Sequence, residues 1–270
     1  MKTKHRIAFT FWGRPLARFR TLPDFLGLGA QRSGTSTLNH YLSQHPQFRS
    51  PIRKEVHYFD KNYYRGVEWY KGYFPMQSRS RISVTGEVSP FYIFHPYCAE
   101  RIARDLPHAR FIVLLRNPVS RAISHYWKQY TTGFETLRIE EAFKAEVERL
   151  APAWEAIKKG ELKIPIEFQK FSYVVRGHYA AQLKRYFSVM DRDRFLILQS
   201  EDFWRKPVEN MDRVCKFLGL DPMSKSLKPA QRGASTAQYE VPHKLIDELT
   251  DYFKPLNEEL YNLLDEEWDW

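Results

Sequence analysis

The chain has 270 residues, enough for one large domain whose apolar core needs no disulfide or metal to hold it. A hydrophobic content of 43% with 16% aromatic residues excludes a disordered chain, and only 12 glycines and 16 prolines exclude a collagen-like or low-complexity one. The formal net charge of +10 favours an anionic partner, whether nucleic acid, acidic lipid, polyanionic glycan or phosphorylated cofactor.

The sequence shows no internal repeat and no linker rich in glycine, serine or proline. We therefore expect a single domain over 24–270, after a basic N-terminal arm over 1–23. Cys98 and Cys215 form no CxxC pair, and no histidines have the spacing of metal ligands, so we predict no metal site. No apolar run is long enough to cross a bilayer, and we expect a soluble, cytoplasmic protein.

Short apolar runs alternate with helical patterns along the chain. The expected strands are 24–28, 82–86, 110–115 and 194–198, and the expected helices are 37–44, 118–130, 140–150, 177–189, 208–218 and 242–264. Nearly continuous apolar strands are typical of parallel sheets that helices cover on both faces. This order predicts an α/β fold of three layers, with a mostly parallel central sheet flanked by helices. Ligands then bind at the carboxyl ends of the strands.

A glycine-containing turn follows the first strand. From Gly29 it reads G-x-x-x-x-G-T-S, which matches the phosphate-binding P-loop except that Thr35 replaces the usual lysine. Backbone N–H groups and the start of a helix favour an anion here, Arg32 adds a positive charge, and several hydroxyls follow. The alternative is a capped turn without a ligand. A P-loop-like phosphate site that does not hydrolyse nucleotide triphosphates fits the missing lysine better than an NTPase does.

The third strand runs directly into a second polar motif, RNPVSRAISHYW. Arg116 falls at the carboxyl end of a buried strand, where a guanidinium needs an anion, and Pro118 suits the first turn of a helix. Ser124 lies on the face of that helix near the strand end. A planar guanidinium with a hydroxyl suits a phosphate group. The alternative is that Arg116 pairs with a structural carboxylate.

Together these segments resemble the sulfotransferases that use 3′-phosphoadenosine 5′-phosphosulfate (PAPS). GAQRSGTSTL is similar to their 5′-phosphosulfate loop and RNPVSRAISHYW to their 3′-phosphate motif. PIRKEVHYFD, VEWYKGYFP and TGEVSPFY resemble the branch of heparan sulfate glucosaminyl 3-O- and N-sulfotransferases, and the chain looks like a soluble bacterial-type member. The resemblance implies sulfuryl transfer from PAPS, without a metal, to a hydroxyl or amine of an acceptor that the sequence does not identify, such as a carbohydrate or small molecule.

The resemblance also implies roles for individual residues. Arg32 takes the place of a catalytic lysine, and Glu55 aligns with the general base of the heparan branch, with His57 as the alternative base. If KEVHYFD is extended, Glu55 and His57 share a side; the alternatives are a salt bridge of Glu55 with a neighbouring cation and a packed His57. The residues expected to bind PAPS are Gln31, Arg32, Ser33, Gly34, Thr35, Ser36, Thr37, Arg116, Ser124, Gln231, Arg232 and Gly233.

Two departures concern the acceptor side. Val88 replaces a lysine of the heparan branch, and Ser36 replaces an arginine that touches the acidic glycan in 3-O-sulfotransferases. These changes argue against heparan sulfate as the acceptor. Two other classes compete with the sulfotransferase. A P-loop kinase lacks its lysine and its metal-binding acid here, and no nucleic-acid-binding motif accompanies the dispersed basic residues.

Overall fold

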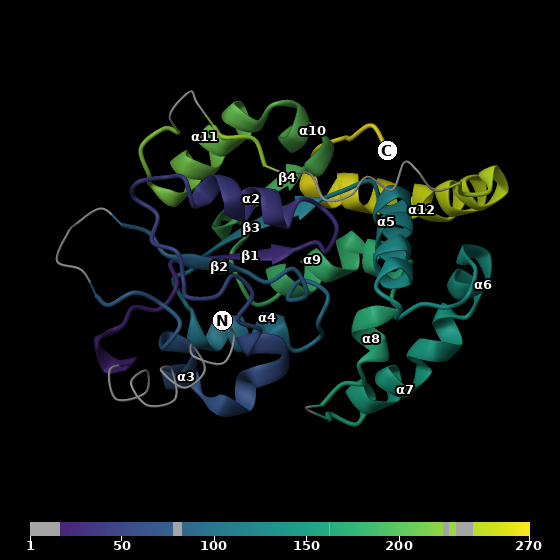
Figure 1. Cartoon of the computed structure of the whole chain (residues 1–270), viewed down its shortest axis with the longest axis horizontal. Coiled ribbons are helices and arrows are strands. Elements are labelled where there is room, and N and C mark those ends of the chain that lie inside the picture. The colour runs from purple at the N-terminus through teal and green to yellow at the C-terminus, as the bar shows by residue number, and fades with distance from the viewer. Residues whose placement is uncertain (1–16, 78–82, 162, 224–226, 231–239) are drawn as a thin grey trace. The chain divides into compact units, whose positions relative to one another are not determined.

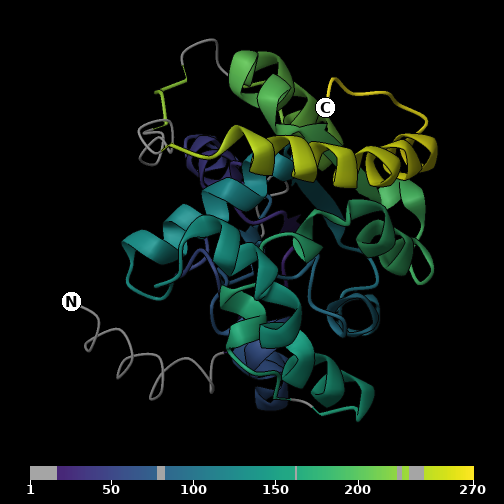
Figure 2. The ribbon, with the colours of Figure 1, turned by 90° about the vertical axis from the view of Figure 1, so that its right-hand side faces the viewer.

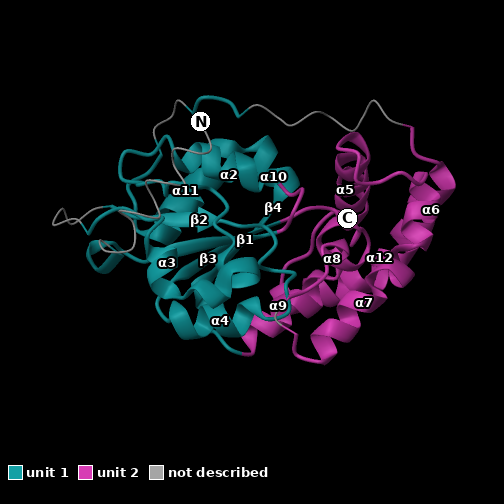
Figure 3. Ribbon diagram, turned by 60° about the horizontal axis from the view of Figure 1, so that its bottom comes forward, with its two compact units in different colours: residues 1–29, 34–114, 189–231 teal, residues 30–33, 115–188, 232–270 magenta. Residues whose placement is uncertain are grey.

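The computed structural model describes residues 17–77, 83–161, 163–223, 227–230 and 240–270. The chain groups into two compact units (Figure 3). Unit 1 comprises 1–29, 34–114 and 189–231, and unit 2 comprises 30–33, 115–188 and 232–270. The single domain over 24–270 stays a prediction, and residues 1–16 of the predicted arm lie outside the described residues.

A four-stranded sheet forms the centre of unit 1. Its strands are β1 (Phe25–Gly29), β2 (Gly86–Val88), β3 (Arg110–Leu115) and β4 (Phe195–Gln199), in the order β2-β1-β3-β4. β1 pairs in parallel with both β2 and β3, and every residue of β1 is buried. Full burial explains why the strands read as continuous apolar runs. The expected boundaries of β1, β3 and β4 are correct to within one residue.

Helices cover both faces of this sheet (Figure 1). α2 (Thr35–Leu42), α10 (Ser200–Arg205) and α11 (Pro207–Leu218) lie on one face, and α4 (Cys98–Asp105) lies on the other. Apolar side chains of α2, α10 and α11 form one core cluster with Phe25, Ile112 and Leu198 of the strands. Side chains alternate along a strand, so the neighbours of these residues face the opposite layer. The three-layer α/β architecture is confirmed.

A region of short helices connects β1 to β2 in unit 1. It contains the π-helix η3 (Tyr58–Asn62), the 3₁₀-helix η4 (Tyr63–Arg65) and α3 (Val67–Lys71), and η2 (Ala17–Phe19) precedes β1. The alternation of apolar residues predicted none of these short elements, nor α4 or α10. Short helices form too few turns for a 3.6-residue period to be recognised.

Unit 2 is helical. Its elements are α5 (Pro118–Thr131), α6 (Ile139–Lys144), α7 (Glu146–Lys158), α8 (Glu167–Lys170), η5 (Val175–Gly177), α9 (Tyr179–Phe187) and α12 (His243–Leu264). α12, the long yellow helix of Figure 2, packs against α5 and α9. Its side chains Leu245, Leu249 and Phe253 join a core cluster with α5 and α6. The expected helices over 118–130, 208–218 and 242–264 are therefore correct to within one residue.

Two expected elements differ from the structure by more than two residues, whereas the helices expected over 37–44 and 177–189 are each displaced by two residues at both ends. The strand predicted over 82–86 begins only at Gly86, because Thr85 donates its N–H to the side chain of Asp24 and its hydroxyl to a backbone carbonyl. Ile82 lies outside the described residues. The helix predicted over 140–150 is divided at Ala145. The second part begins with the buried Glu146, whose carboxylate accepts the N–H groups of Val174 and Val175. These tertiary contacts override the local amphipathic pattern.

The phosphate loop and the KEVHYFD segment as a candidate active site

The loop between β1 and α2 has the backbone geometry of an anion site. Arg32 has φ 72° and Gly34 has φ 88°, so left-handed residues alternate with others along the turn. Such alternation directs successive N–H groups toward one side. Gly34 is the N-cap of α2, and no side chain caps that helix. The free amino end of α2 therefore favours a negative group.

Glycine is required at position 34 for two reasons. Its positive φ is one that other residues rarely adopt, and an added Cβ would lie 2.7 Å from the indole Nε1 of Trp204. The residues after it begin the helix. Thr35 is buried, Ser36 is exposed and Thr37 is half-buried. The hydroxyls of this predicted run thus differ in access, and Ser36 is the one most open to a ligand.

Within unit 2, three of the predicted residues meet. The Nε of Arg32 donates to the Oγ of Ser124 at 3.0 Å, and Nη1 of Arg116 donates to the backbone carbonyl of Arg32 at 3.3 Å. Ser124 lies in α5, and Arg116 follows β3, so chain segments more than 80 residues apart converge on one turn. Burial, and then the charge of Arg116, lower the pKa of Arg32. A bound anion would favour the charged form of Arg32 and so oppose both effects on its pKa.

Arg176 is a further member that the sequence did not predict. It is buried, and its Nη1 donates to the side-chain oxygen of Gln31, the residue before Arg32. Its other nitrogens donate to Ser172 Oγ at 2.6 Å and to the carbonyl of Gln169 at 2.9 Å. Arg176 therefore fixes the Gln31 side of the loop. No local motif marks it, because its partner is 145 residues away.

Ser33 completes the described part of the loop. It is fully buried, and its N–H donates to Ala30 at 3.2 Å, which closes the turn. The predicted residues Gln231, Arg232 and Gly233 lie outside the described residues, so their part in the site stays a prediction.

A second group of predicted residues lies in unit 1, in the KEVHYFD segment. His57 contacts two carboxylates: its Nδ1 is 2.7 Å from Asp60 Oδ2 and its Nε2 is 3.4 Å from Glu55 Oε2. Lys54 Nζ is 3.2 Å from Glu55 Oε1 and donates to Ser36 Oγ at 2.8 Å. Lys54 thereby joins Glu55 to the exposed hydroxyl at the start of α2. The expectation of a salt bridge at Glu55 and that of a contact with His57 both hold.

The contact between Glu55 and His57 does not arise from an extended strand, as the sequence predicted. The segment is not extended throughout, because His57 has φ 56° and η3 begins at Tyr58. The left-handed turn brings the imidazole over Asp60, three residues ahead, while it still reaches Glu55. His57 is also only 13% exposed, so the expectation of a packed histidine is partly correct.

Electrostatics separate the two candidate bases. Burial lowers the pKa of His57, but hydrogen bonds to Asp60 and Glu55 and the charge of Asp60 outweigh it and raise the pKa to about 9. Burial raises the pKa of Glu55, but the hydrogen bond from His57 and the charge of Lys54 outweigh it, and the pKa is lowered. At neutral pH the imidazole is therefore a cation and Glu55 a carboxylate.

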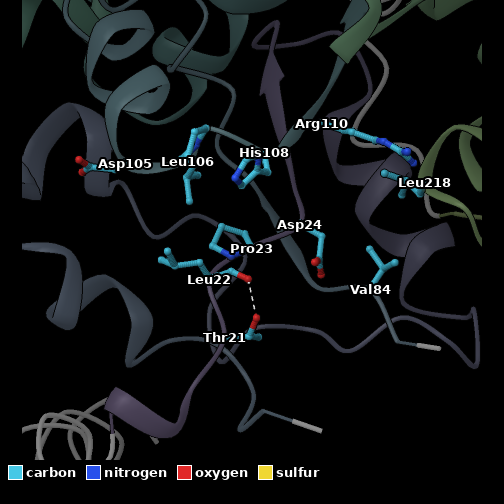
Figure 4. Close-up of a pocket in the computed structure, with 12 residues that line it drawn as sticks. Thr21, Leu22, Pro23, Asp24, Val84, Asp105, Leu106, His108, Arg110 and Leu218 are labelled. Atoms are coloured by element: carbon cyan, nitrogen blue, oxygen red, sulfur yellow. Dashed lines mark hydrogen bonds between the residues drawn. The ribbon is translucent and has the colours of Figure 1, made fainter. Parts of the chain in front are cut away.

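A pocket of about 410 Å³ lies elsewhere in unit 1 (Figure 4). Asp24, His108 and Arg110 are among the residues that line it. Asp24 precedes β1, and Arg110 begins β3, so the pocket adjoins the amino ends of these strands. The phosphate loop follows the carboxyl end of β1, which excludes this pocket from the candidate site.

The described ranges hold no group of three or more histidine, cysteine or acidic side chains that could bind a metal ion. In the same part of the chain, no helix combines the length and apolar character needed to span a bilayer. The absence of a metal requirement and a cytoplasmic location stay predictions.

Comparisons with known proteins identify the family. A model of the sulfotransferase domain matches residues 22–239. The chain is 27% identical to human heparan sulfate glucosamine 3-O-sulfotransferase 6 over 96% of the chain and 77% of that protein. It is also 27% identical to the membrane-associated sulfotransferase Kil1 of Dictyostelium discoideum over 92% of the chain, but spans only 66% of Kil1.

A solved structure agrees with these relatives. The crystal structure of a sulfotransferase from Alicyclobacillus acidocaldarius has a TM-score of 0.73 and 31% sequence identity, and the match covers 92% of this chain and 98% of that one. The shared fold supports the resemblance that the two phosphate motifs indicated. The chain belongs to the sulfotransferase domain family, and its predicted enzyme class is confirmed.

Proposed function

We propose that the chain transfers a sulfuryl group from PAPS to a hydroxyl group of a carbohydrate or small-molecule acceptor. The meeting of Arg32, Arg116 and Ser124 carries the proposal, because it joins the two motifs that resemble the 5′-phosphosulfate and 3′-phosphate sites. Among the described residues, Arg32 forms no salt bridge with a carboxylate, which fits a site built for an anionic ligand.

Different groups of the chain are suited to bind different parts of PAPS. The loop N–H groups, the amino end of α2 and Arg32 are suited to the 5′-phosphosulfate, and Arg116 and Ser124 to the 3′-phosphate. PAPS supplies the sulfuryl group and leaves as adenosine 3′,5′-bisphosphate. Arginine stays charged, so Arg32 cannot donate a proton to that leaving group. It stabilises the developing charge on the phosphate only through its own positive charge.

Glu55 is the better candidate for the general base. The acceptor oxygen forms a bond to sulfur while the bond from sulfur to the 5′-phosphate oxygen breaks, and the acceptor proton must leave. Glu55 is ionised at neutral pH and can take that proton, whereas His57 already carries one. His57 then orients the carboxylate, and Asp60 holds the imidazole in place.

The acceptor side carries limited positive charge. Val88 is buried in β2, so no cation replaces the lysine that the heparan branch has there. Lys54 restores a positive group at Ser36, where an arginine is otherwise found. A single restored group favours an acceptor that is less anionic than heparan sulfate.

The test combines binding with an acceptor screen. We expect adenosine 3′,5′-bisphosphate to bind more tightly than 5′-AMP in titration calorimetry. Arg116→Ala should weaken the bisphosphate by about 2–4 kcal/mol and change 5′-AMP binding little, because it removes the contact to the 3′-phosphate. Equal losses for the two nucleotides would refute the assignment. A screen with ³⁵S-labelled PAPS across glycans, phenols, steroids and hydroxyacyl thioesters should then identify the acceptor class.

A further inference from the structure

Glu87 is a fully buried carboxylate in β2 that accepts four hydrogen bonds. Its Oε2 accepts the N–H of Val56 at 2.8 Å and the hydroxyl of Ser89 at 2.7 Å. Its Oε1 accepts the hydroxyls of Tyr70 at 2.8 Å and Tyr92 at 2.9 Å. Within the described residues it forms no salt bridge. Four donors on two oxygens match the acceptor capacity of an ionised carboxylate.

The network fixes alternate backbone groups of the KEVHYFD segment. Val88, next to Glu87, donates its N–H to the carbonyl of Lys54 at 3.3 Å. Glu87 itself holds the N–H of Val56, and Tyr92 holds the N–H of Tyr58 at 2.8 Å. Residues 54, 56 and 58 are thus anchored to β2 and its continuation. The residues between them are the proposed base Glu55 and its partner His57.

Aromatic packing closes the same network. Tyr70 donates to Glu87, and its ring is stacked on Tyr58 with centroids 4.5 Å apart and planes 12° apart. Tyr58 is therefore held through its backbone by Tyr92 and through its ring by Tyr70. Tyr92 and Tyr70 both donate a hydrogen bond to the Glu87 carboxylate. The left-handed backbone at His57 lies between two anchored residues, Val56 and Tyr58.

We propose that Glu87 is a positioning residue for sulfuryl transfer, which anchors the backbone between Glu55 and His57 so that the two side chains meet. This inference rests on the proposed function only for its effect on turnover. The anchoring itself is a property of the free protein. Burial raises the pKa of Glu87 although all four donors favour its charged form, and keeping a carboxylate in so costly a place fits a group whose donors set the path of a segment.

Two variants probe the anchor. In Glu87→Gln the amide nitrogen cannot accept, so two of the four donors must turn away or lose their partner. Tyr92→Phe leaves the carboxylate in place but removes the acceptor of the Tyr58 N–H. Misplacement of the base by about 1 Å lowers turnover by up to ~100-fold, so we expect kcat to fall about 10–100-fold in both variants. Affinity for adenosine 3′,5′-bisphosphate should stay within about twofold, because the network does not touch residues 30–33.

Glu135→Gln is the matched control. Glu135 is likewise a buried carboxylate that accepts backbone N–H groups, from Thr136 and Leu137, and a tyrosine hydroxyl, from Tyr173. It differs from Glu87 in its salt bridge with Arg149, at 2.6 Å. It lies in unit 2, and so do its hydrogen-bond partners among the described residues. We expect this variant to lower Tm but to leave kcat with the best acceptor of the screen, and the titration of His57, as in the natural chain.

The titration of His57, followed by NMR of ¹³C-labelled histidine, reads the anchor without catalysis. We expect the pKa of His57 to fall from about 9 by at least one unit in Glu87→Gln and in Tyr92→Phe, because the contacts to Glu55 and Asp60 loosen. Folded variants with an unchanged pKa and unchanged kcat would overturn the proposal. If Glu87→Gln does not fold, Tyr92→Phe decides alone. Full turnover in Glu55→Gln together with a lowered His57 pKa in Glu87→Gln would reject the base assignment and support the anchor.

Discussion

The charge on His57 leads to a prediction about stability and pH. The pKa of His57 is about 9 in the folded protein, against an ordinary value of 6.5. A raised pKa means that the folded state binds the proton more tightly than the unfolded chain does. The resulting stability is fully present below pH 6.5 and is lost as the pH rises through about 9. A difference of two to three pKa units corresponds to ~3 kcal/mol.

Urea unfolding of the natural chain and His57→Gln measures this contribution. At pH 6 the variant should be less stable by ~3 kcal/mol, and at pH 9.5 most of that difference should have disappeared. His178→Gln is the control, because burial lowers the pKa of His178. A lowered pKa places its pH dependence below about pH 6.5, outside the window of His57. A stability difference for His57→Gln that stays constant from pH 6 to 9.5 would show that His57 is not the buried cation.

The same charge predicts the pH profile of turnover. With Glu55 as the base, the acidic limb of kcat should lie below pH 4.5, since the pKa of Glu55 is lowered from that value. With His57 as the base, kcat should instead rise until about pH 9. A limb near pH 9 that vanishes in His57→Gln would reverse the assignment of the two residues.

Three further predictions concern the base, the loop and metals. Glu55→Gln should lower kcat by about 10²–10⁴-fold with nucleotide affinity nearly unchanged, and full activity in single-turnover measurements would exclude the carboxylate. Gly34→Ala should weaken adenosine 3′,5′-bisphosphate at least ~10-fold in calorimetry, since its Cβ would collide with Trp204; normal binding would contradict the described loop. Sulfuryl transfer should continue in EDTA, and a strict Mg²⁺ requirement in the radiolabel assay would favour a kinase instead.

The sequence predicted those parts of the fold and site whose evidence lies close together in the chain. The run RFIVLL marks β3 because a strand buried on both faces is apolar throughout. Arg116 was found because it directly follows such a strand, and Arg32 because it lies in the P-loop-like turn after β1. β1 and β3 are parallel neighbours, so their carboxyl ends lie side by side. This explains why Arg116 lies close enough to donate to the carbonyl of Arg32.

The rest depends on partners that no local pattern joins. Val56 lies 31 residues from Glu87, and Gln31 lies 145 residues from Arg176, so neither pairing has a spacing that a motif could show. The contact of His57 with Asp60 depends on a left-handed residue, which the alternation of KEVHYFD does not reveal. Sequence reasoning thus found residues suited to bind the donor and to act as the base. It did not find Arg176 and Glu87, which hydrogen-bond to the segments that carry those residues.

Left-handed backbone occurs at two of the predicted site residues and allows a final test. Among the described non-glycine residues, only Arg32, His57 and Asp265 have positive φ, and the first two are among the three predicted catalytic residues. Strain of this kind costs about 1–3 kcal/mol per residue and is retained where function needs the conformation. Glycine relieves it and alanine does not, so Arg32→Gly and His57→Gly should each be more stable than the matching alanine variants by ~1 kcal/mol. At Glu258, exposed in the interior of α12, the order should reverse, since glycine destabilises a helix interior by ~1 kcal/mol relative to alanine. Alanine variants at 32 and 57 that match or exceed the glycine variants in urea unfolding would show that these positions are not held in the left-handed conformation.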